Sequence, residues 1–144
     1  MNKLTPAQKA LYLVPFKKLK DSKAWKLTSE YVRKKGARIT REGVWNQCYT
    51  CKNWFPFNKL VAGHSDEKIG HASTYFDLDG LRPQDYRCNR KLHGDYARFT
   101  MNLIEEIGIE RVKQLRIRAG KSKVWTLLEI EKLAEERKKM LEEL

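Results

Sequence analysis

The sequence CYTC at residues 48–51 and the sequence DYRCNRKLH at residues 85–93 decide the expected fold, and His64 lies between them. Each stretch carries two metal-ligand residue types separated by two other residues. A two-residue spacer lets a tight turn direct both side chains of a pair at one ion, so two pairs can close one tetrahedral zinc site. The four expected ligands are Cys48, Cys51, Asp85 and Cys88.

Asp85 stands three residues before Cys88, where a fourth cysteine would complete the ligand set. A carboxylate oxygen binds zinc at about the distance of an imidazole nitrogen, but it is a harder donor and is expected to weaken the site. The alternative is a set of three buried structural cysteines with a solvated Asp85. We favour a structural zinc site because of the spacing.

The charge of the chain predicts a nucleic-acid partner. The 144 residues carry 30 Lys and Arg against 18 Asp and Glu, a formal net charge of +12. Residues 1–45 alone hold twelve basic and three acidic side chains. A basic surface attracts polyanions by releasing their counterions, whereas solubility, the alternative explanation, would not require so uneven a distribution.

Cysteine content and hydropathy indicate the compartment. Three cysteines cannot all pair in disulfides, and the sequence has no apolar run of signal-peptide or membrane-span length. We therefore expect no membrane partner and a cytoplasmic location.

Hydrophobic periodicity predicts an α+β fold with a small zinc-stapled core. Helices are expected at about residues 5–14, 22–35, 87–107, 109–118 and 123–144. Short strands around a turn are expected over 44–45, 48–51, 54–57 and 60–62, with residues 65–86 irregular. The expected regions are a basic helical region at 1–44, the zinc-stabilised core at 45–108, and C-terminal helices at 109–144.

The last helix carries a heptad-like apolar seam that is broken by Arg137. The seam can pack within the chain, or it can join two copies in a homodimer; both alternatives stay open. Its apolar residues are Leu127, Ile130, Ala134, Leu141 and Leu144.

Phosphodiester hydrolysis needs a base that activates water and a metal that neutralises phosphate charge. His64 is the candidate base, although a lone histidine is more often structural. Asn89 and His93 are four residues apart on a predicted helix, so they can approach one divalent ion together. The irregular segment offers Asp66, His71 and Asp77 as further ligands.

Basic residues near these positions are candidate phosphate contacts, and solvated charge is the alternative for each. Those near the core are Arg82, Arg87, Arg90, Lys91 and Arg98, and those on the predicted N-terminal helix are Lys26, Arg33 and Lys34.

From about residue 24 to residue 115 the chain resembles the phage NinG family, also called Rap, of lambdoid recombination nucleases. The resemblance rests on ordered pieces that include the CYTC and CNR motifs: Trp25, residues 31–33 (YVR), 48–51 (CYTC), 62–64 (AGH), 76–77 (FD), 83–84 (PQ) and 88–90 (CNR), Leu92, Gly94, Tyr96, Gly108, Val112 and Leu115.

This resemblance implies an HNH nuclease with a ββα-metal site. It implies His64 as general base, Asn89 with His93 as holders of a catalytic Mg²⁺ or Mn²⁺, and a structural zinc. It further implies an endonuclease that cleaves branched DNA such as Holliday junctions during phage recombination, and a recombinase as a partner.

Two positions depart from the family pattern. Gly80 stands where the family has the middle Asn that braces the loop of the base, and Asp85 stands where it has a zinc-binding Cys. Asp79 or His71 are the neighbours that can compensate. These departures leave two alternatives: a weakened or inactive zinc protein that binds DNA structures, and a general HNH nuclease of another phage pathway.

Overall fold

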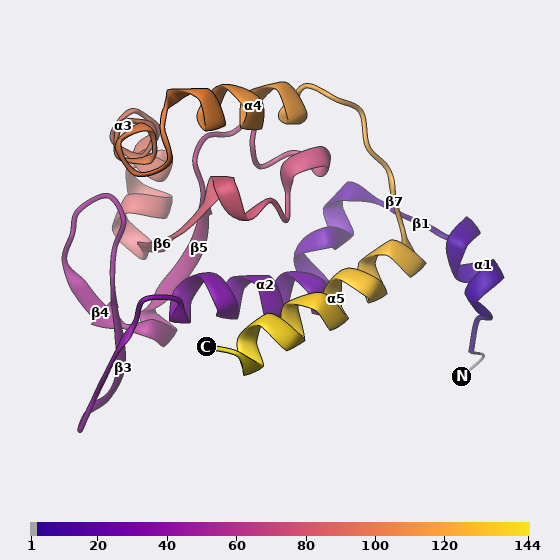
Figure 1. Ribbon diagram of the computed structural model, residues 1–144, viewed down its shortest axis with the longest axis horizontal. Coiled ribbons are helices and arrows are strands. Elements are labelled where there is room, and N and C mark those ends of the chain that lie inside the picture. Colours follow the sequence, from indigo (N-terminus) through magenta and orange to yellow (C-terminus); the bar gives the residue numbers. More distant parts are fainter. Residues whose placement is uncertain (1–2) are drawn as a thin grey trace.

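A computed structural model describes residues 3–144 and shows the α+β fold that the sequence predicts (Figure 1). Its α-helices are α1 (Pro6–Leu11), α2 (Lys23–Lys34), α3 (Tyr96–Ile107), α4 (Ile109–Ala119) and α5 (Leu127–Glu142). Its strands are β1 (Leu13–Val14), β2 (Arg38–Thr40), β3 (Gly43–Gln47), β4 (Trp54–Pro56), β5 (Leu60–His64), β6 (Leu81–Asp85) and β7 (Trp125–Thr126). The strands form three small sheets, β1–β7, β2–β3–β4 and β5–β6.

The first two helices begin at the capping residues that the sequence provides. Thr5 and Gln8 form a reciprocal capping box at the start of α1. The Ser22 hydroxyl accepts a hydrogen bond from the Trp25 N–H at the start of α2. Beyond the end of α2, Gly36 adopts a φ of 74°, which glycine tolerates without strain.

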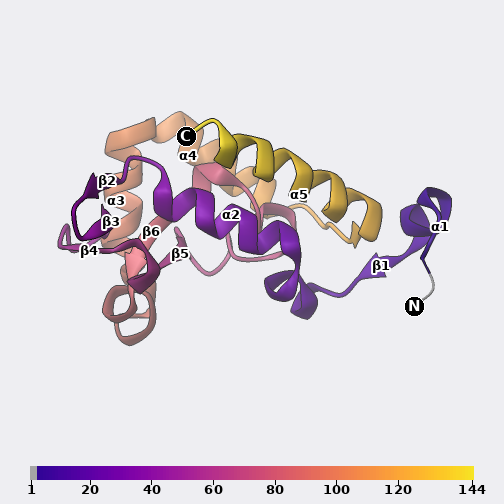
Figure 2. The ribbon, with the colours of Figure 1, turned by 90° about the horizontal axis from the view of Figure 1, so that it is seen from below.

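Helix α2 packs against α5 and also against the hairpin β5–β6 (Figure 1, Figure 2). Val32 of α2 packs with Ala62 and Leu81 of the hairpin. Ala24 of α2 lies in a second cluster with Ile130 of α5. Helix α2 is thus the element that ties the C-terminal helix to the hairpin.

The hairpin β5–β6 determines where the site residues lie. Leu60 pairs with Asp85 at one end, and His64 pairs with Leu81 at the other. A strand rises about 3.4 Å per residue, so the two ends are about 13 Å apart. The expected zinc ligand Asp85 and the expected base His64 therefore occupy opposite ends of one rigid element.

One strand prediction was wrong. The segment 65–86, expected to be irregular, contains strand β6, whereas residues 48–51 form the turn between β3 and β4. The sequence of β6, LRPQD, mixes a proline with polar residues, yet Gln84 and Asp85 are buried there. A burial pattern that depends on hydrogen-bonded polar side chains cannot be read from hydrophobic alternation.

Two helix predictions also need correction. The helix expected at 87–107 is divided into a π-helical turn at Arg87–Lys91, a break, and α3. The break contains His93, Gly94 and Asp95, with φ values of 51°, 80° and 46°. The helix expected at 123–144 begins only at Leu127, because the preceding residues pair with β1.

The apolar seam of α5 packs within the chain. Ile130 and Ala134 are buried against α2 and Phe76. Arg137 is only 7% exposed and donates hydrogen bonds to the Phe76 carbonyl oxygen at 3.0 Å and to the Thr28 hydroxyl at 3.2 Å. At the end of the seam, Leu144 is 57% exposed. None of the helices within residues 3–144 has the length and apolarity needed to cross a bilayer.

Candidate functional site

The four expected zinc ligands lie together although they come from two separate segments. Ligand atoms of Cys48, Cys51, Asp85 and Cys88 all lie within 4.8 Å of one another. A tetrahedral ion with Zn–S distances of about 2.3 Å would hold its sulfur atoms about 3.8 Å apart. The donor set and its spacing fit a metal ion such as zinc after a small contraction.

Hydrogen bonds hold the four side chains in this arrangement. The Cys51 thiol donates to Asp85 Oδ2 at 2.9 Å, and the Cys88 N–H donates to Asp85 Oδ1 at 2.9 Å. The Asp85 N–H lies 3.4 Å from the Cys48 sulfur, and the Thr50 hydroxyl lies 3.3 Å from it. Such donors support a metal-bound thiolate, which is how outer-shell groups tune zinc sites.

Burial affects the protonation of the ligand set. It raises the pKa of the Cys51 thiol to about 12, and the hydrogen bond to Asp85 adds to this effect. Burial also raises the pKa of Cys88. Burial of Asp85 opposes its ionisation, but hydrogen bonds from Cys51 and from the Cys88 N–H outweigh it, so the pKa of Asp85 lies below its usual value. A bound cation would favour the deprotonated thiolates that the protein alone disfavours.

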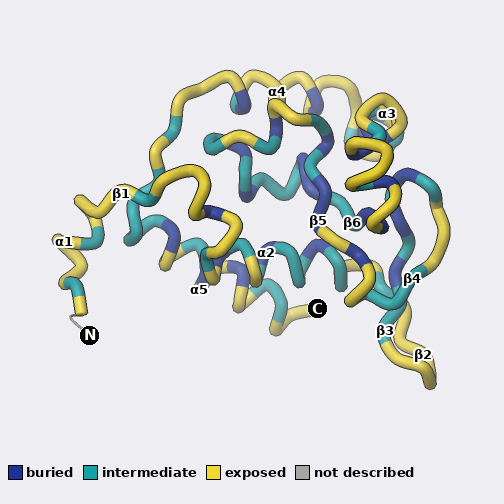
Figure 3. The backbone as a smooth tube through the Cα atoms, turned by 180° about the vertical axis from the view of Figure 1, so that it is seen from behind, coloured by how far each residue is buried: buried dark blue, intermediate teal, exposed yellow. Residues whose placement is uncertain are grey.

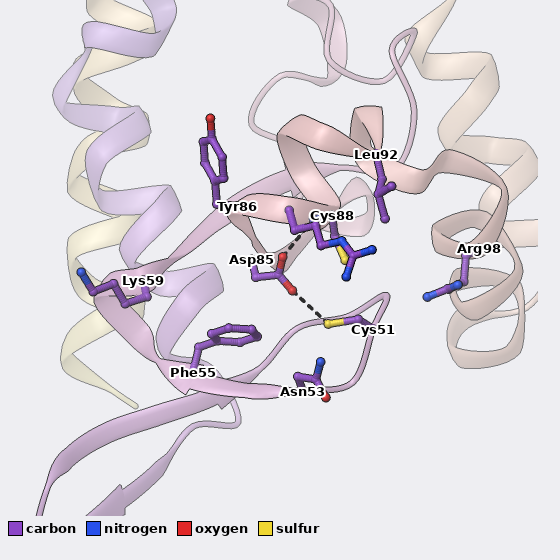
Figure 4. A pocket seen from close by; sticks show the side chains of 10 residues that line it. Cys51, Asn53, Phe55, Lys59, Asp85, Tyr86, Cys88, Leu92 and Arg98 are labelled. Carbon is purple, nitrogen blue, oxygen red and sulfur yellow. Dashed lines mark hydrogen bonds between the residues drawn. The ribbon is translucent and has the colours of Figure 1, made fainter.

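A hollow opens beside the ligand cluster (Figure 4). Cys51 and Asp85 face it, while Lys59 and Arg98 border it from different elements. Arg87 also lines it. The outer side of the expected zinc site is therefore surrounded by positive charge.

His64 lies against α2 at the far end of the hairpin. Its ring stacks on Trp25, with centroids 5.5 Å apart and an interplanar angle of 8°. Its Nε2 lies 3.0 Å from the Tyr75 carbonyl oxygen. Burial lowers the pKa of His64, and the hydrogen bond to Tyr75 and the charge of Asp66 only partly oppose this shift. The imidazole is therefore neutral at pH 7.

The hydrogen bond fixes the tautomer of this neutral ring. A carbonyl oxygen can only accept, so Nε2 carries the proton and Nδ1 has a free lone pair. Nδ1 forms no hydrogen bond with residues 3–144. The residue as a whole is partly exposed.

Asn89 belongs to a network of amides on the other face of the hairpin. The buried Gln84 side chain covers Gly63, where a Cβ atom would lie 1.9 Å from Gln84 Oε1. Gln84 Nε2 donates to the Gly94 carbonyl oxygen at 2.8 Å, so Oε1 faces Asn89 and accepts from its Nδ2 at 3.2 Å. This orientation turns Asn89 Oδ1 away from Gln84. This oxygen accepts no hydrogen bond within residues 3–144 and is free to bind a metal ion.

The other expected metal ligands do not gather in one place. His93 and His71 are exposed, and the His71 ring lies 5.7 Å from that of Phe16. Asp77 accepts from Arg118 Nε at 2.8 Å. Over residues 3–144, the only group of three or more His, Cys, Asp or Glu whose ligand atoms can share an ion is the cluster of Cys48, Cys51, Asp85 and Cys88. Alternation along β5 places His64 on the α2 face and Asn89 beyond the opposite face.

The expected DNA contacts fall into two groups. Arg82 binds Glu106 at 3.0 Å, Lys34 binds Glu30 at 2.7 Å, and Arg33 donates to Ser29. Arg98 is exposed but lies 3.4 Å from Asp95. Those that are exposed and form no ion pair within the described range are Lys26, Arg87, Arg90 and Lys91.

The Gly80 position has no room for a side chain. A Cβ atom there would lie 2.5 Å from Ile69 Cγ2. The Gly80 carbonyl oxygen instead accepts from the Ser65 N–H at 2.9 Å, directly after His64. The backbone thus braces the loop of the expected base. Asp79, which the sequence offers as a compensating residue, binds Arg118 and Arg111.

Sequence reasoning gave no role to the residues that position His64. Trp25 stacks on the ring, and its place in the family resemblance was the available sign of its importance. The Tyr75 carbonyl oxygen and the close approach of Gly70 to the ring have no signature in the sequence.

The comparisons with known proteins agree with the resemblance. A family model described as "Bacteriophage Lambda NinG protein" matches residues 3–144. No curated protein and no solved structure matches the chain. Because the family model covers nearly the whole sequence, the chain belongs to the family of the bacteriophage lambda NinG protein.

Proposed function

We propose that this protein is a metal-dependent, HNH-type endonuclease that cleaves branched DNA, such as Holliday junctions, in phage recombination. Membership of the NinG family suggests a recombination-related role. The basic composition supports DNA as the partner. In this proposal a structural zinc at Cys48, Cys51, Asp85 and Cys88 holds the hairpin and the following turn in place.

The state of His64 is the observation that carries the proposal. A general base needs a neutral ring, a fixed orientation and an accessible lone pair. Burial keeps the ring neutral, the Tyr75 carbonyl oxygen and Trp25 fix it, and Nδ1 has no hydrogen-bond partner within residues 3–144. Nδ1 can therefore take a proton from the water that attacks a scissile phosphate.

In this proposal Asn89 Oδ1 would hold a catalytic Mg²⁺ or Mn²⁺. His93, which is exposed in the break after the π-helical turn and not on one helix with Asn89, would be the second protein ligand. Mg²⁺ often uses few protein ligands and completes its shell with water and substrate phosphate. Within the described residues, no second group of three or more His, Cys, Asp or Glu could share an ion. A site with few protein ligands does not need such a group. When bound, the ion would supply charge neutralisation at the phosphate.

The exposed residues Arg87, Arg90 and Lys91 are the proposed phosphate contacts. All three lie on the π-helical turn that follows Asp85, so metal binding at Asp85 and Cys88 would fix their direction. Lys26 projects from α2, the helix that carries Trp25. Phosphate contacts from these elements would place the backbone of DNA near the hairpin.

A non-cleaving protein that binds DNA structures through its zinc module is the second candidate. The placement of His64 and Asn89 on different faces of the hairpin favours it, because a base and a metal ligand must meet at one phosphate. Tight, salt-sensitive binding of junctions without any product would support this candidate.

Cleavage of a labelled four-way junction with Mg²⁺ or Mn²⁺ tests the proposal. The wild-type protein is expected to produce nicks. His64→Gln should reduce the rate about a hundredfold or more, because Gln can donate to the Tyr75 carbonyl oxygen but cannot take the proton. Equal rates for the two proteins, or an intact junction with both ions, would contradict the proposal.

Two measurements complete this experiment. Zinc content and circular dichroism of His64→Gln should equal those of the wild type, which separates lost chemistry from lost folding. Flap, single-stranded and linear duplex DNA serve as competing substrates. Faster cleavage of linear duplex than of junctions would assign the nuclease to another phage pathway.

A further inference from the structure

One face of the sheet β2–β3–β4 carries aromatic and basic side chains outside the core. The register pairs Arg38 with Trp45, and Gln47 with Trp54. Directly paired residues and residues two apart share a face, so all four side chains lie on one face. The opposite face packs inward through Asn46, which donates to carbonyl oxygens of the α2 end at 2.8 and 3.0 Å.

Arg38 and Trp54 already form a stack on this face. The Arg38 guanidinium carbon lies 4.5 Å from the centre of the Trp54 ring, within the range of a cation–π contact. Trp54 is still 38% exposed. Trp45 is half-buried and belongs to none of the buried clusters of the described chain. We call Arg38, Trp45 and Trp54 the aromatic platform.

The platform projects from the body of the protein and is positively charged. Figure 3 shows β2 exposed along its length at the end of the hairpin that it forms with β3. Residues 35–54 contain Lys35, Arg38, Arg41 and Lys52 against the single acidic Glu42. No carboxylate within residues 3–144 forms an ion pair with these four cations.

We propose that the aromatic platform binds unpaired bases of single-stranded or branched DNA. A base can stack on Trp45 or on the outer plane of the Arg38 guanidinium, while the exposed Arg41 contacts a neighbouring phosphate. This proposal deepens the proposed function and rests on it, since it names the DNA feature that the protein selects.

The chemistry of the platform favours unpaired DNA over the other partners. Bases in a closed duplex stack on each other, so their faces are not available to Trp45 or Arg38. A protein partner with an apolar surface would meet Arg38 and the exposed Arg41, neither of which forms an ion pair within residues 3–144. Bases at a branch point or in a single strand offer both free faces and negative charge.

Tryptophan fluorescence during titration with DNA tests this proposal. The probes are an oligonucleotide of about twelve thymidines and a blunt duplex of the same length, without added Mg²⁺. The single strand is expected to quench the fluorescence and to bind more tightly than the duplex. Trp54→Leu removes the ring on which the Arg38 guanidinium lies, so the plane that receives a base is lost. It should weaken single-strand binding about tenfold or more, since stacking contributes about 1–3 kcal/mol per base, and should change duplex binding less than twofold.

Two further variants separate stacking from charge. Arg38→Lys keeps the charge but lacks the planar group, so it should weaken binding of the single strand only. Lys138→Ala removes one cation from the exposed face of α5, and it should not change the preference for single strands. Zinc content and circular dichroism confirm that each variant is folded.

Three results would overturn the proposed role of the platform. The first is an equal loss of affinity for single-stranded and duplex DNA in Trp54→Leu. The others are an unchanged affinity in both platform variants and binding by the wild type without quenching. These outcomes leave the nuclease proposal standing if junctions are still cleaved. If the wild type never cleaves DNA but the single-strand effects occur, the nuclease proposal fails and the platform stands.

Discussion

At the scale of single residues, His64 is held by contacts that fix its ring and its proton. Trp25 covers one face, and the Tyr75 carbonyl oxygen accepts from Nε2. Desolvation is the largest cause of its lowered pKa. The same contacts that suit a base also make the folded state sensitive to acid. The buried ring gains a proton less readily than the exposed ring of the unfolded chain, so acid favours unfolding.

This sensitivity predicts a pH dependence of stability. The unfolded chain takes up a proton at His64 near the usual pKa of about 6.5, whereas the folded chain does so only at lower pH. The contribution of the neutral His64 to stability is therefore fully present above about pH 6.5. It is lost as the pH falls from there through the lower pKa of His64 in the folded chain. Urea unfolding at several pH values, with zinc present, measures this loss.

The matched variant is His64→Gln, which lacks the titrating ring. Its stability should fall less steeply than that of the wild type between about pH 6.5 and pH 5. Parallel curves for the two proteins would show that other groups, such as the thiolates, cause the whole acid effect. Such a result would contradict the assigned environment of His64.

At the scale of elements, α5 depends on a buried charge as well as on its apolar seam. Arg137 interrupts the heptad pattern, yet its guanidinium reaches the Phe76 carbonyl oxygen and the Thr28 hydroxyl. It also lies 3.0 Å from the exposed Glu136 carboxylate. This side chain joins α5 to α2 and to the loop that follows His64.

Arg137→Ala is therefore expected to lower the free energy of unfolding by about 3 kcal/mol. The substitution removes two buried hydrogen bonds and leaves the Phe76 carbonyl oxygen without its partner. Urea denaturation measures the effect. Lys138→Ala, one residue further along the helix and exposed, should change stability by less than about 0.5 kcal/mol. Equal effects of both substitutions would contradict the buried role of Arg137.

The sequence predicted those elements whose determinants are local. The capping box at Thr5, the helix 22–35 with Gly36 as its stop, and strand β5 follow from capping and periodicity. Strand β6 and the break at Gly94 depend on partners distant in sequence. Gln84 is buried because it reaches the Gly94 carbonyl oxygen and Asn89, and no local pattern contains this information.

In the candidate site too, the sequence predicted only the features with local determinants. The spacing of Cys48, Cys51 and Cys88 identified the metal cluster because ligand geometry restricts spacing. The exposure and ion pairing of basic residues could not be predicted, since Arg82 is engaged by Glu106 from α3. The placement of His64 and Asn89 on opposite faces of the hairpin depends on the strand register, which cannot be read from the sequence.

At the scale of the whole molecule, the proposed zinc joins two parts of a small protein. The turn at Cys48 and Cys51 leads into the sheet β2–β3–β4, while Asp85 and Cys88 end β6 and begin the π-helical turn. Phe55 and Leu60 pack around the cysteines in a small cluster. A core of this size gains much of its stability from a metal that crosslinks its parts.

The ligand set predicts how affinity responds to substitution. Asp85→Cys should bind zinc more tightly than the wild type, because a thiolate is a softer donor than a carboxylate. Cys51→Ser should bind it more weakly. Competition with a chromophoric chelator ranks the three proteins, and an unchanged affinity in both variants would place the ion elsewhere.

The most direct test of the account is the zinc content of the purified protein, measured together with its circular dichroism before and after chelation. The account predicts about one zinc per chain and a loss of the folded signal when the zinc is removed. A protein that contains no zinc, or one that keeps its full structure and thermal stability after the metal has been stripped, would contradict it.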